Sequence, residues 1–378
     1  HRRNFKDFLF GVRSKGCYTL SQMSRLSFYN LNLQELEQAL VGRGKEKCRA
    51  QQLFRWIYGQ RVTDFSQMTN LSKVFQGEMA ELLDLTLPEM VTERISSDGT
   101  RKYLFNMGDS QLVESVLIPS DDRLTLCLSS EVGCNMACQF CYTGKQKLKR
   151  RLTAGQIVGQ FLQVSDRLPE AQRITNLVFM GMGEPLDNPE AVFRSIEIFH
   201  STWGLNLSRK RITVSTSGIV PLIPLVTASG ARLAVSLNGV NDEVRSQIMP
   251  INKKWPLEEL LEACRVHCRE SKDKVTLEYV LLKGVTDSIQ DARDLHRIAQ
   301  SVPSKVNIIP FNEHPGSGFH RPDEKAINAF HNELMRLGTH VLRRKTMGRD
   351  ILAACGQLAT NPDARPRPRA KTQPEATL

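Results

Sequence analysis

The chain has 378 residues, of which 40% are hydrophobic, and a formal net charge of +11. This length is enough to bury a sizeable core and indicates two or three domains. No run of 18 apolar residues occurs, which argues against a membrane span. Nine cysteines in so long a chain do not form the pattern of a small, secreted disulfide framework.

The positive charge suggests a polyanionic partner, but most of it lies near the ends. Residues 1–30 contribute +5 and residues 361–378 contribute +2, which leaves +4 for the rest of the chain. We expect residues 1–29 to be a disordered basic arm or a targeting remnant, and residues 361–378 to be a disordered tail. The densest internal patch, KQKLKRR at 145–151, could follow a phosphate backbone or could be a solvated face.

The first folded part is predicted to be helical. From Asn32 to about residue 85, apolar residues recur at spacings of three and four, with Asn32 as an N-cap. We therefore expect a small helical accessory domain over residues 30–88. Residues 89–120 instead alternate between apolar and polar residues around two turns, which predicts a β-hairpin linker.

After Leu124 strands and helices alternate, which predicts parallel β/α units. The expected strands are 124–129, 174–180, 211–216, 232–237, 275–282 and 305–311. The expected helices are 153–167, 189–200, 219–229, 256–270 and 288–301, followed by a helix at 323–337 and a strand at 340–346. The fold class is thus α/β, with a partial barrel of six units over residues 121–346 and a cysteine-bearing loop at 347–360.

Unusual polar residues follow the predicted strands, where parallel β/α barrels collect their functional groups. They are GMGEP at 181–185, STSG at 215–218, SLN at 236–238 and FN at 311–312. Each could also be an ordinary glycine turn or helix cap. Together they predict one functional rim.

The cluster loop, residues 127–141 (CLSSEVGCNMACQFC), stands on the same rim. Cys134, Cys138 and Cys141 form a CxxxCxxC array, and Cys127 ends the strand before it. Three thiolates could hold a [4Fe–4S] cluster by three irons and leave the fourth iron open. A zinc site completed by a distant side chain and coincidental core cysteines are the alternatives. Cys264 and Cys268 share one helix face, where core thiols are favoured over a second metal site.

The CxxxCxxC spacing resembles the radical-SAM superfamily. With MGMGEP, STSG, PINKK and AACGQL in this order, the chain resembles the radical-SAM RNA adenine methyltransferases of the RlmN type (the RlmN/Cfr family) from about residue 30 to residue 358. This resemblance implies a partial (β/α)6 radical-SAM barrel with a small N-terminal helical domain that helps to grip RNA.

The resemblance also implies the reaction, which is methylation of carbon 2 of one adenosine in large-subunit rRNA and of a tRNA adenosine beside the anticodon. One S-adenosylmethionine (SAM) methylates Cys355, and a second SAM is cleaved at the cluster to a radical that activates this methyl group. Cys127 then releases the product by forming a disulfide with Cys355, and Glu114 takes the carbon-2 proton.

The remaining site residues are also implied by the resemblance. The cluster ligands are Cys134, Cys138 and Cys141. The SAM contacts are Gly183, Glu184, Ser215, Ser236, Leu237, Asn238 and Asn312. Bacterial members commonly have His where Asn238 stands, and because Asn does not protonate, we expect Asn238 to be a contact and not an acid or base.

Two other functions remain open from the sequence. One is carbon-8 methylation of adenine, as in enzymes of the Cfr type, and the other is a non-catalytic, metal-dependent RNA-binding protein. The expected partners are large-subunit rRNA, tRNA and an external electron donor, with no membrane, and we expect a monomer. Thiols and an oxygen-sensitive cluster need a reducing compartment, which is the cytoplasm in a bacterium and the plastid or mitochondrion in a eukaryote.

Overall fold

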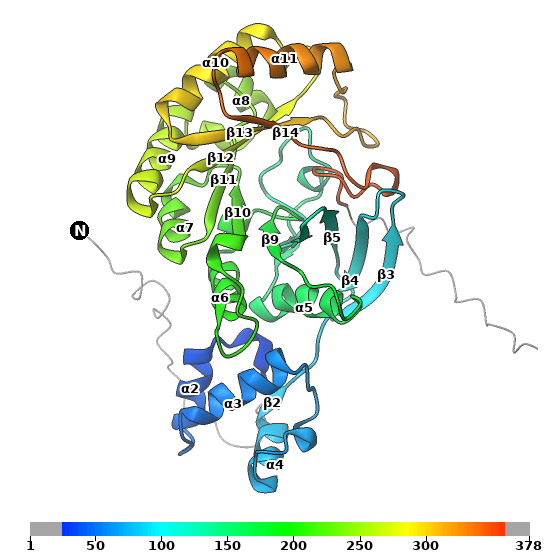
Figure 1. Ribbon diagram of the computed structural model, residues 1–378, viewed down its shortest axis with the longest axis vertical. Coiled ribbons are helices and arrows are strands. Elements are labelled where there is room, and N and C mark those ends of the chain that lie inside the picture. Colours follow the sequence, from blue (N-terminus) through cyan, green and yellow to red (C-terminus); the bar gives the residue numbers. More distant parts are fainter. Residues whose placement is uncertain (1–24, 360–378) are drawn as a thin grey trace, which may run out of the picture.

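A computed structural model describes residues 25–359 (Figure 1). The basic arm up to residue 24, Cys17 and the tail at 361–378 lie outside these residues. Figure 1 shows a small helical domain at one end of the molecule and a large curved sheet, with its helices, above it. No helix within residues 25–359 is long and apolar enough to cross a membrane.

The helical domain contains α2 (Leu33–Val41), α3 (Cys48–Phe54) and α4 (Lys73–Leu82). Asn32 caps α2, as predicted: its side chain accepts a hydrogen bond from the Glu35 N–H, and the Glu35 carboxylate accepts one from the Asn32 N–H. This capping box satisfies two amide groups at the helix start. One turn of π-helix, Arg55–Gly59, continues α3.

Ordered structure begins before residue 30, within the segment that the sequence predicts to be a disordered arm. β1 (Leu26–Ser27) pairs with β2 (Leu83–Asp84). Phe28 and Tyr29 are buried, and the Phe28 ring lies 5.5 Å from that of Phe54. We predicted disorder here because the segment is basic and nearly free of acidic residues. Burial of these two aromatic side chains instead orders the end of the segment.

The main sheet has ten strands in the order β14-β13-β12-β11-β10-β9-β6-β5-β4-β3. The run from β6 to β14 is parallel, whereas β3, β4 and β5 are antiparallel and continue the sheet from β6. The strands are β3 (Glu89–Ile95), β4 (Arg101–Asn106), β5 (Leu112–Ser120), β6 (Arg123–Cys127), β9 (Asn176–Phe179), β10 (Ile212–Thr216), β11 (Arg232–Ser236), β12 (Val275–Leu281), β13 (Ser304–Pro310) and β14 (Val341–Arg343).

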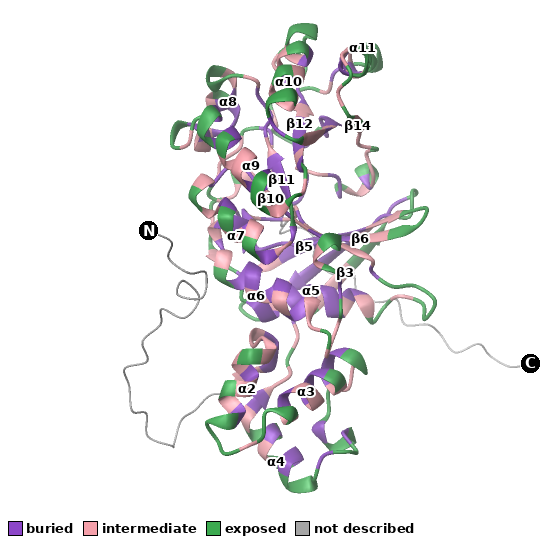
Figure 2. Ribbon diagram, turned by 60° about the vertical axis from the view of Figure 1, so that its left-hand side comes forward, coloured by how far each residue is buried: buried purple, intermediate pink, exposed green. Residues whose placement is uncertain are grey.

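Helices cover the outer face of the parallel run, with buried residues toward the sheet and exposed residues outward (Figure 2). They are α5 (Ala154–Ser165), α6 (Pro189–His200), α7 (Ile223–Ser229), α8 (Asp242–Ile248), α9 (Leu257–Ser271), α10 (Ile289–Ser301) and α11 (Glu324–Arg336). Because β14 pairs with β13 and not with β6, the barrel stays open between β14 and β6. This open side is called the seam below.

The partial barrel predicted from the alternating pattern is confirmed, strand by strand, to within a few residues. The two turns predicted within residues 89–120 separate three strands, β3, β4 and β5. Two features were not predicted: α8 follows β11, and β7 (Glu131–Val132) pairs with β8 (Arg150–Arg151). Short elements such as β7 and β8 carry too few residues to show a period.

Candidate active site

The cluster loop leaves the end of β6 and places three thiols on one cavity wall. Cys134, Cys138 and Cys141 are partly exposed and line a cavity of about 170 Å³ at the carboxyl ends of the strands. Two glycines shape the loop. Gly133 has φ +81°, and a Cβ atom on it would clash with the Lys147 carbonyl; a Cβ atom on Gly144 would lie 2.7 Å from the Cys138 carbonyl oxygen.

The chemistry of these donors fits an iron–sulfur cluster. Burial raises the pKa of all three thiols, so the loop by itself favours their neutral forms. A bound metal centre would favour the thiolates. Within residues 25–359, no group of three or more His, Cys, Asp or Glu side chains is already placed around a metal ion, so the fit to a cluster rests on the chemistry of the three thiols that share one cavity wall.

The GMGEP turn after β9 forms another part of the wall of this cavity. A Cβ atom on Gly183, at φ +99°, would lie 2.5 Å from the Glu131 Cβ atom, so only glycine fits this approach. The buried Glu184 carboxylate accepts hydrogen bonds from the N–H groups of Ser217 (2.7 Å) and Leu186 (3.0 Å). Burial raises the pKa of Glu184, against the effect of these bonds. Glu184 thus ties the turn after β9 to the end of β10.

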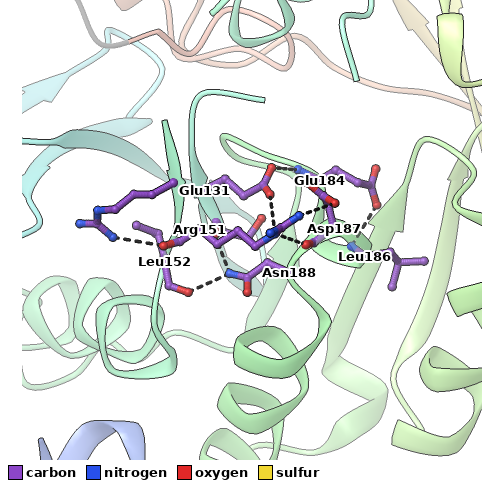
Figure 3. Close-up of polar contacts among 9 residues, drawn as sticks. Glu131, Arg151, Leu152, Glu184, Leu186, Asp187 and Asn188 are labelled. Carbon is purple, nitrogen blue, oxygen red and sulfur yellow. Dashed lines mark hydrogen bonds and ion pairs between the residues drawn. The ribbon is translucent and has the colours of Figure 1, made fainter. Parts of the chain in front are cut away.

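A second buried carboxylate, that of Glu131, lies beside this turn (Figure 3). Glu131 is fully buried, and its Oε2 atom accepts a hydrogen bond from the Glu184 N–H at 2.9 Å. Arg151 reaches Asp187 at 2.8 Å and Glu131 at 3.8 Å. Asn188 donates to the carbonyl oxygens of Ser130 and Leu152. Burial raises the pKa of Glu131 to about 8, so the ion pair of Arg151 is mainly with Asp187.

The ends of β10 and β11 are held by a buried arginine that sequence reasoning missed. Arg245 donates to the carbonyl oxygens of Leu237 (2.9 Å) and Ser217 (2.6 Å) and to the side chain of Asn252 (2.7 Å). Burial lowers its pKa to about 10. Asn252 belongs to the PINKK motif, so this motif contributes to the site through Arg245. The Leu237 side chain is buried and lies off the cavity wall.

Two asparagines complete the wall. Asn238 has φ +53°, a conformation that Asn tolerates better than most residues, and its Oδ1 atom accepts from the Val280 N–H. Asn312 donates to the Cys355 carbonyl oxygen at 3.2 Å. The Oδ1 atom of Asn312 and the hydroxyl of Ser217 are buried without a hydrogen-bond partner among the described residues. Such acceptors fit a polar cofactor such as SAM.

The cavity gathers all of the predicted site residues except Cys127, Glu114 and Leu237. Its wall includes Cys134, Cys138, Cys141, Gly183, Glu184, Ser215, Ser236, Asn238, Asn312 and Cys355. They come from the cluster loop, from the ends of four strands (β9, β10, β11 and β13) and from the C-terminal segment. The sequence prediction of one functional rim matches this arrangement, and the assignment of each residue to SAM stays a prediction.

A second cavity, of about 360 Å³, lies beside the first. Cys127 and Cys355 both line it, and Cys355 lines the first cavity as well. Burial raises the pKa of the Cys127 thiol to about 12, with a further contribution from Cys355. Burial also raises the pKa of Cys355, and the nearby Arg344 guanidinium opposes this rise. The two thiols that lie far apart in the sequence thus meet in one space.

Glu114 lies outside both cavities. It lines a hollow of about 100 Å³ with Lys102 and Ala359. Its carboxylate pairs with Lys102 at 3.0 Å and accepts a hydrogen bond from the Ala359 N–H at 3.0 Å. The segment that carries Cys355 therefore covers Glu114, and a role in proton removal would need this segment to move.

Two charged residues on the first cavity wall were also missed. Arg344 follows β14 directly, and its guanidinium lies 3.6 Å from the Glu278 carboxylate of β12. Glu278 is the one charged residue of the otherwise apolar strand β12, and this is a signal that could have found it. Arg344 lies between Arg343 and Lys345, so its charge does not stand out in the sequence. Arg344 lines both cavities.

The basic run at 145–151 divides into two parts. Arg150 pairs with Asp109 at 2.5 Å and Arg151 pairs with Asp187, so these two arginines are held by acidic side chains. Lys147 and Lys149 are exposed. Lys147 and Lys149 therefore remain candidates for binding phosphate, whereas Arg150 and Arg151 are already paired.

Two family models match the chain. The Radical SAM superfamily matches residues 129–296, and the Ribosomal RNA large subunit methyltransferase N-terminal domain matches residues 26–85. A dual-specificity RNA methyltransferase RlmN of Bdellovibrio bacteriovorus is 64% identical over 335 residues, which cover 89% of this chain and 84% of the relative. The chain belongs to the RlmN family. The RlmN of Geobacter sulfurreducens is 48% identical, covering 88% of this chain and 92% of the relative.

The structure agrees with this membership in the RlmN family. The crystal structure of a radical SAM methyltransferase from Sphaerobacter thermophilus has a TM-score of 0.83 and 43% identity, and the match covers 88% of this chain and 99% of that chain. The predicted resemblance is confirmed, and the chain is a radical-SAM RNA methyltransferase. Membership implies a [4Fe–4S] cluster and SAM as cofactors and RNA as substrate.

Proposed function

We propose that this RlmN-family chain methylates carbon 2 of one adenosine in large-subunit rRNA and of a tRNA adenosine beside the anticodon. One observation carries the proposal: Cys355 stands on the wall shared by two cavities, with the three cluster-loop thiols in one and Cys127 in the other. An enzyme that moves a methyl group from SAM to RNA through a cysteine needs this arrangement.

Cofactors would occupy the first cavity. Cys134, Cys138 and Cys141 would hold a [4Fe–4S] cluster, which would supply the electron for reductive cleavage of SAM. Gly183 admits SAM close to the backbone. The unpaired acceptors of Ser217 and Asn312 would take hydrogen bonds from SAM.

The chain's own thiols carry the methyl group. The Cys355 thiolate takes the methyl group from one SAM, and S-adenosylhomocysteine leaves. The second SAM would leave as methionine and 5′-deoxyadenosine, which carries away one hydrogen atom of the S-methyl group, and carbon 2 loses its proton after the methylene carbon has joined it. The Cys127 thiolate then attacks the Cys355 sulfur. The bond from that sulfur to carbon breaks, the carbon takes up a proton to become the methyl group, a disulfide forms, and an external donor returns two electrons. A turnover uses two SAM molecules, and we expect the enzyme to act as a monomer.

The product identifies the reaction. After incubation of the reconstituted, anaerobic protein with SAM, a reductant and large-subunit rRNA, we expect nucleoside mass analysis to find 2-methyladenosine. Finding 8-methyladenosine would favour the Cfr-type reaction. Finding neither, with zinc in place of iron, would favour a non-catalytic RNA-binding protein.

Substitution of each thiol separates their roles. In Cys127→Ala we expect protein to remain covalently attached to RNA, because the thiol that resolves the intermediate is missing. In Cys355→Ala we expect no methylation and an unchanged iron content. Denaturing gels and iron analysis measure both, and normal yields of free methylated RNA from Cys127→Ala would contradict the assignment.

A further inference from the structure

The second cavity follows the seam of the barrel. Side chains at alternate positions of β5 and β6 line one side of it, and residues of β13 and of the stretch after β14 line the other. On β5 these are Val116, Ile118 and Ser120, and on β6 they are Arg123, Thr125 and Cys127. Because side chains alternate along a strand, each set belongs to one face. The cavity is thus the gap that an unclosed barrel leaves.

The inner part of the seam suits a flat ring. Apolar side chains of Val116, Ile118, Met180, Ile309 and Leu358 line it, next to both thiols. Its volume of about 360 Å³ lies within the range of roughly 300–1,000 Å³ that small-molecule sites occupy. Enzymes that react at a base in a nucleic acid take that base out of the stack into such a pocket.

The rim of the seam is basic. Arg123, Arg344 and Lys345 line the cavity, together with hydroxyl groups of Ser120, Thr125 and Thr346, and no acidic residue of the described chain is on its wall. Arg123 forms an ion pair at 3.2 Å with its neighbour Asp122, but both side chains are mostly exposed, at 61% and 79%. Exposed pairs of this kind are weak, so a phosphate could replace the aspartate.

Arg123 and Lys345 stand on the two sides of this opening. Arg123 begins β6, and Lys345 lies two residues beyond the end of β14. Both are exposed. We propose that Arg123 and Lys345 bind the RNA phosphates on either side of the target nucleotide while its base enters the seam. This assignment rests on the proposed function and adds the residues that hold the RNA there.

The test compares Arg123→Gln and Lys345→Gln with Arg232→Gln. Arg232 is an exposed arginine of β11 that lines neither cavity. The probe is a large-subunit rRNA transcript, and its Kd is measured at several salt concentrations. The logarithm of the affinity falls as the logarithm of the salt concentration rises, and loss of the ion pair with one phosphate should make this slope shallower by about 0.7–0.9. We expect this reduction in both seam variants and not in Arg232→Gln.

The second measurement is the methylation of Cys355 by SAM in the absence of RNA, detected as a change in the mass of the peptide that contains Cys355. We expect it to be unchanged in the seam variants, since SAM binds in the other cavity, and unchanged melting temperatures would show that they fold. Wild-type salt slopes in both seam variants, or an equal reduction in Arg232→Gln, would overturn the assignment of Arg123 and Lys345. Absence of the methyl group from Cys355 of the unsubstituted protein would instead overturn the proposed function.

Discussion

Glu114 and Lys102 form an ion pair inside the protein, with side-chain exposures of only 8% and 9%. Burial raises the pKa of Glu114, and Lys102 and the Ala359 N–H oppose that rise. Lys102 also donates to the Leu352 carbonyl oxygen at 3.2 Å. A carboxylate that accepts a proton during catalysis must be charged beforehand. Lys102 therefore favours the charged form of the proposed base, against the effect of burial.

We expect Lys102→Met to move the acid limb of the methylation rate to higher pH. Without the lysine, the pKa of Glu114 rises further, so less of it is deprotonated near neutral pH, and activity returns as the pH is raised. Breaking a buried pair should also lower the free energy of unfolding by about 3–5 kcal/mol. Single-turnover rates from pH 6 to 9 and thermal melts measure these effects.

Lys325→Met, at an exposed position of α11, is the control and should change neither the rate profile nor the melt. An unshifted acid limb in a folded Lys102→Met protein would remove Glu114 from the reaction as a base.

At the scale of single residues, the sequence predicted those that act together and also lie close together in the chain. The spacing of Cys134, Cys138 and Cys141 is readable because all three lie in one loop. Arg344 was missed because its partner Glu278 lies on a distant strand, and Arg245 was missed because it lies on α8, a helix that was not predicted. The position of Glu114 under the C-terminal segment depends on tertiary packing, which no local pattern contains.

Among elements, the parallel strands and their helices were predictable because each is long enough to show its period. The contacts that position the C-terminal segment were not predictable from the sequence. Asp98, in the turn between β3 and β4, accepts a hydrogen bond from the Gly348 N–H at 2.8 Å, and Asp350 accepts one from the Ser96 hydroxyl at 2.5 Å. This turn therefore anchors the segment that carries Cys355.

We expect Asp98→Ala to loosen this segment. Burial would raise the pKa of Asp98, but hydrogen bonds from Gly348 and Thr100 prevail and lower it to about 2. The charged carboxylate therefore stabilises the segment above the unfolded pKa, near 4, and this stabilisation disappears as the pH falls toward 2. Removing the side chain should reduce local stability by about 1–3 kcal/mol. Hydrogen exchange of residues 348–355 measures this.

Asp121→Ala, in the exposed turn before β6, provides the matched control and should leave the exchange of residues 348–355 unchanged. Equal exchange rates in the Asp98→Ala and unsubstituted proteins would mean that other contacts hold the segment.

In the whole molecule, the helical domain is fixed against the barrel by polar and steric contacts. Arg61 binds Asp166 through two hydrogen bonds of 2.9 and 2.7 Å, and Arg194 pairs with Glu35 at 2.8 Å. The backbone before β3 also packs closely on α5, where Pro88 lies against Gly159. An RNA held by both domains needs a fixed distance between them, which these contacts provide.

We expect Gly159→Ala to weaken RNA binding while the cluster and the methylation of Cys355 stay intact. The added Cβ atom would clash with the ring of Pro88, which must shift together with the chain that joins the two domains. Gly77→Ala is the control, because a Cβ atom there meets nothing within 4 Å in α4. It should stabilise the protein by up to about 1 kcal/mol through helix propensity. Binding of the rRNA transcript measures the difference, and equal Kd values for the two variants would mean that the helical domain grips RNA independently of its place on the barrel.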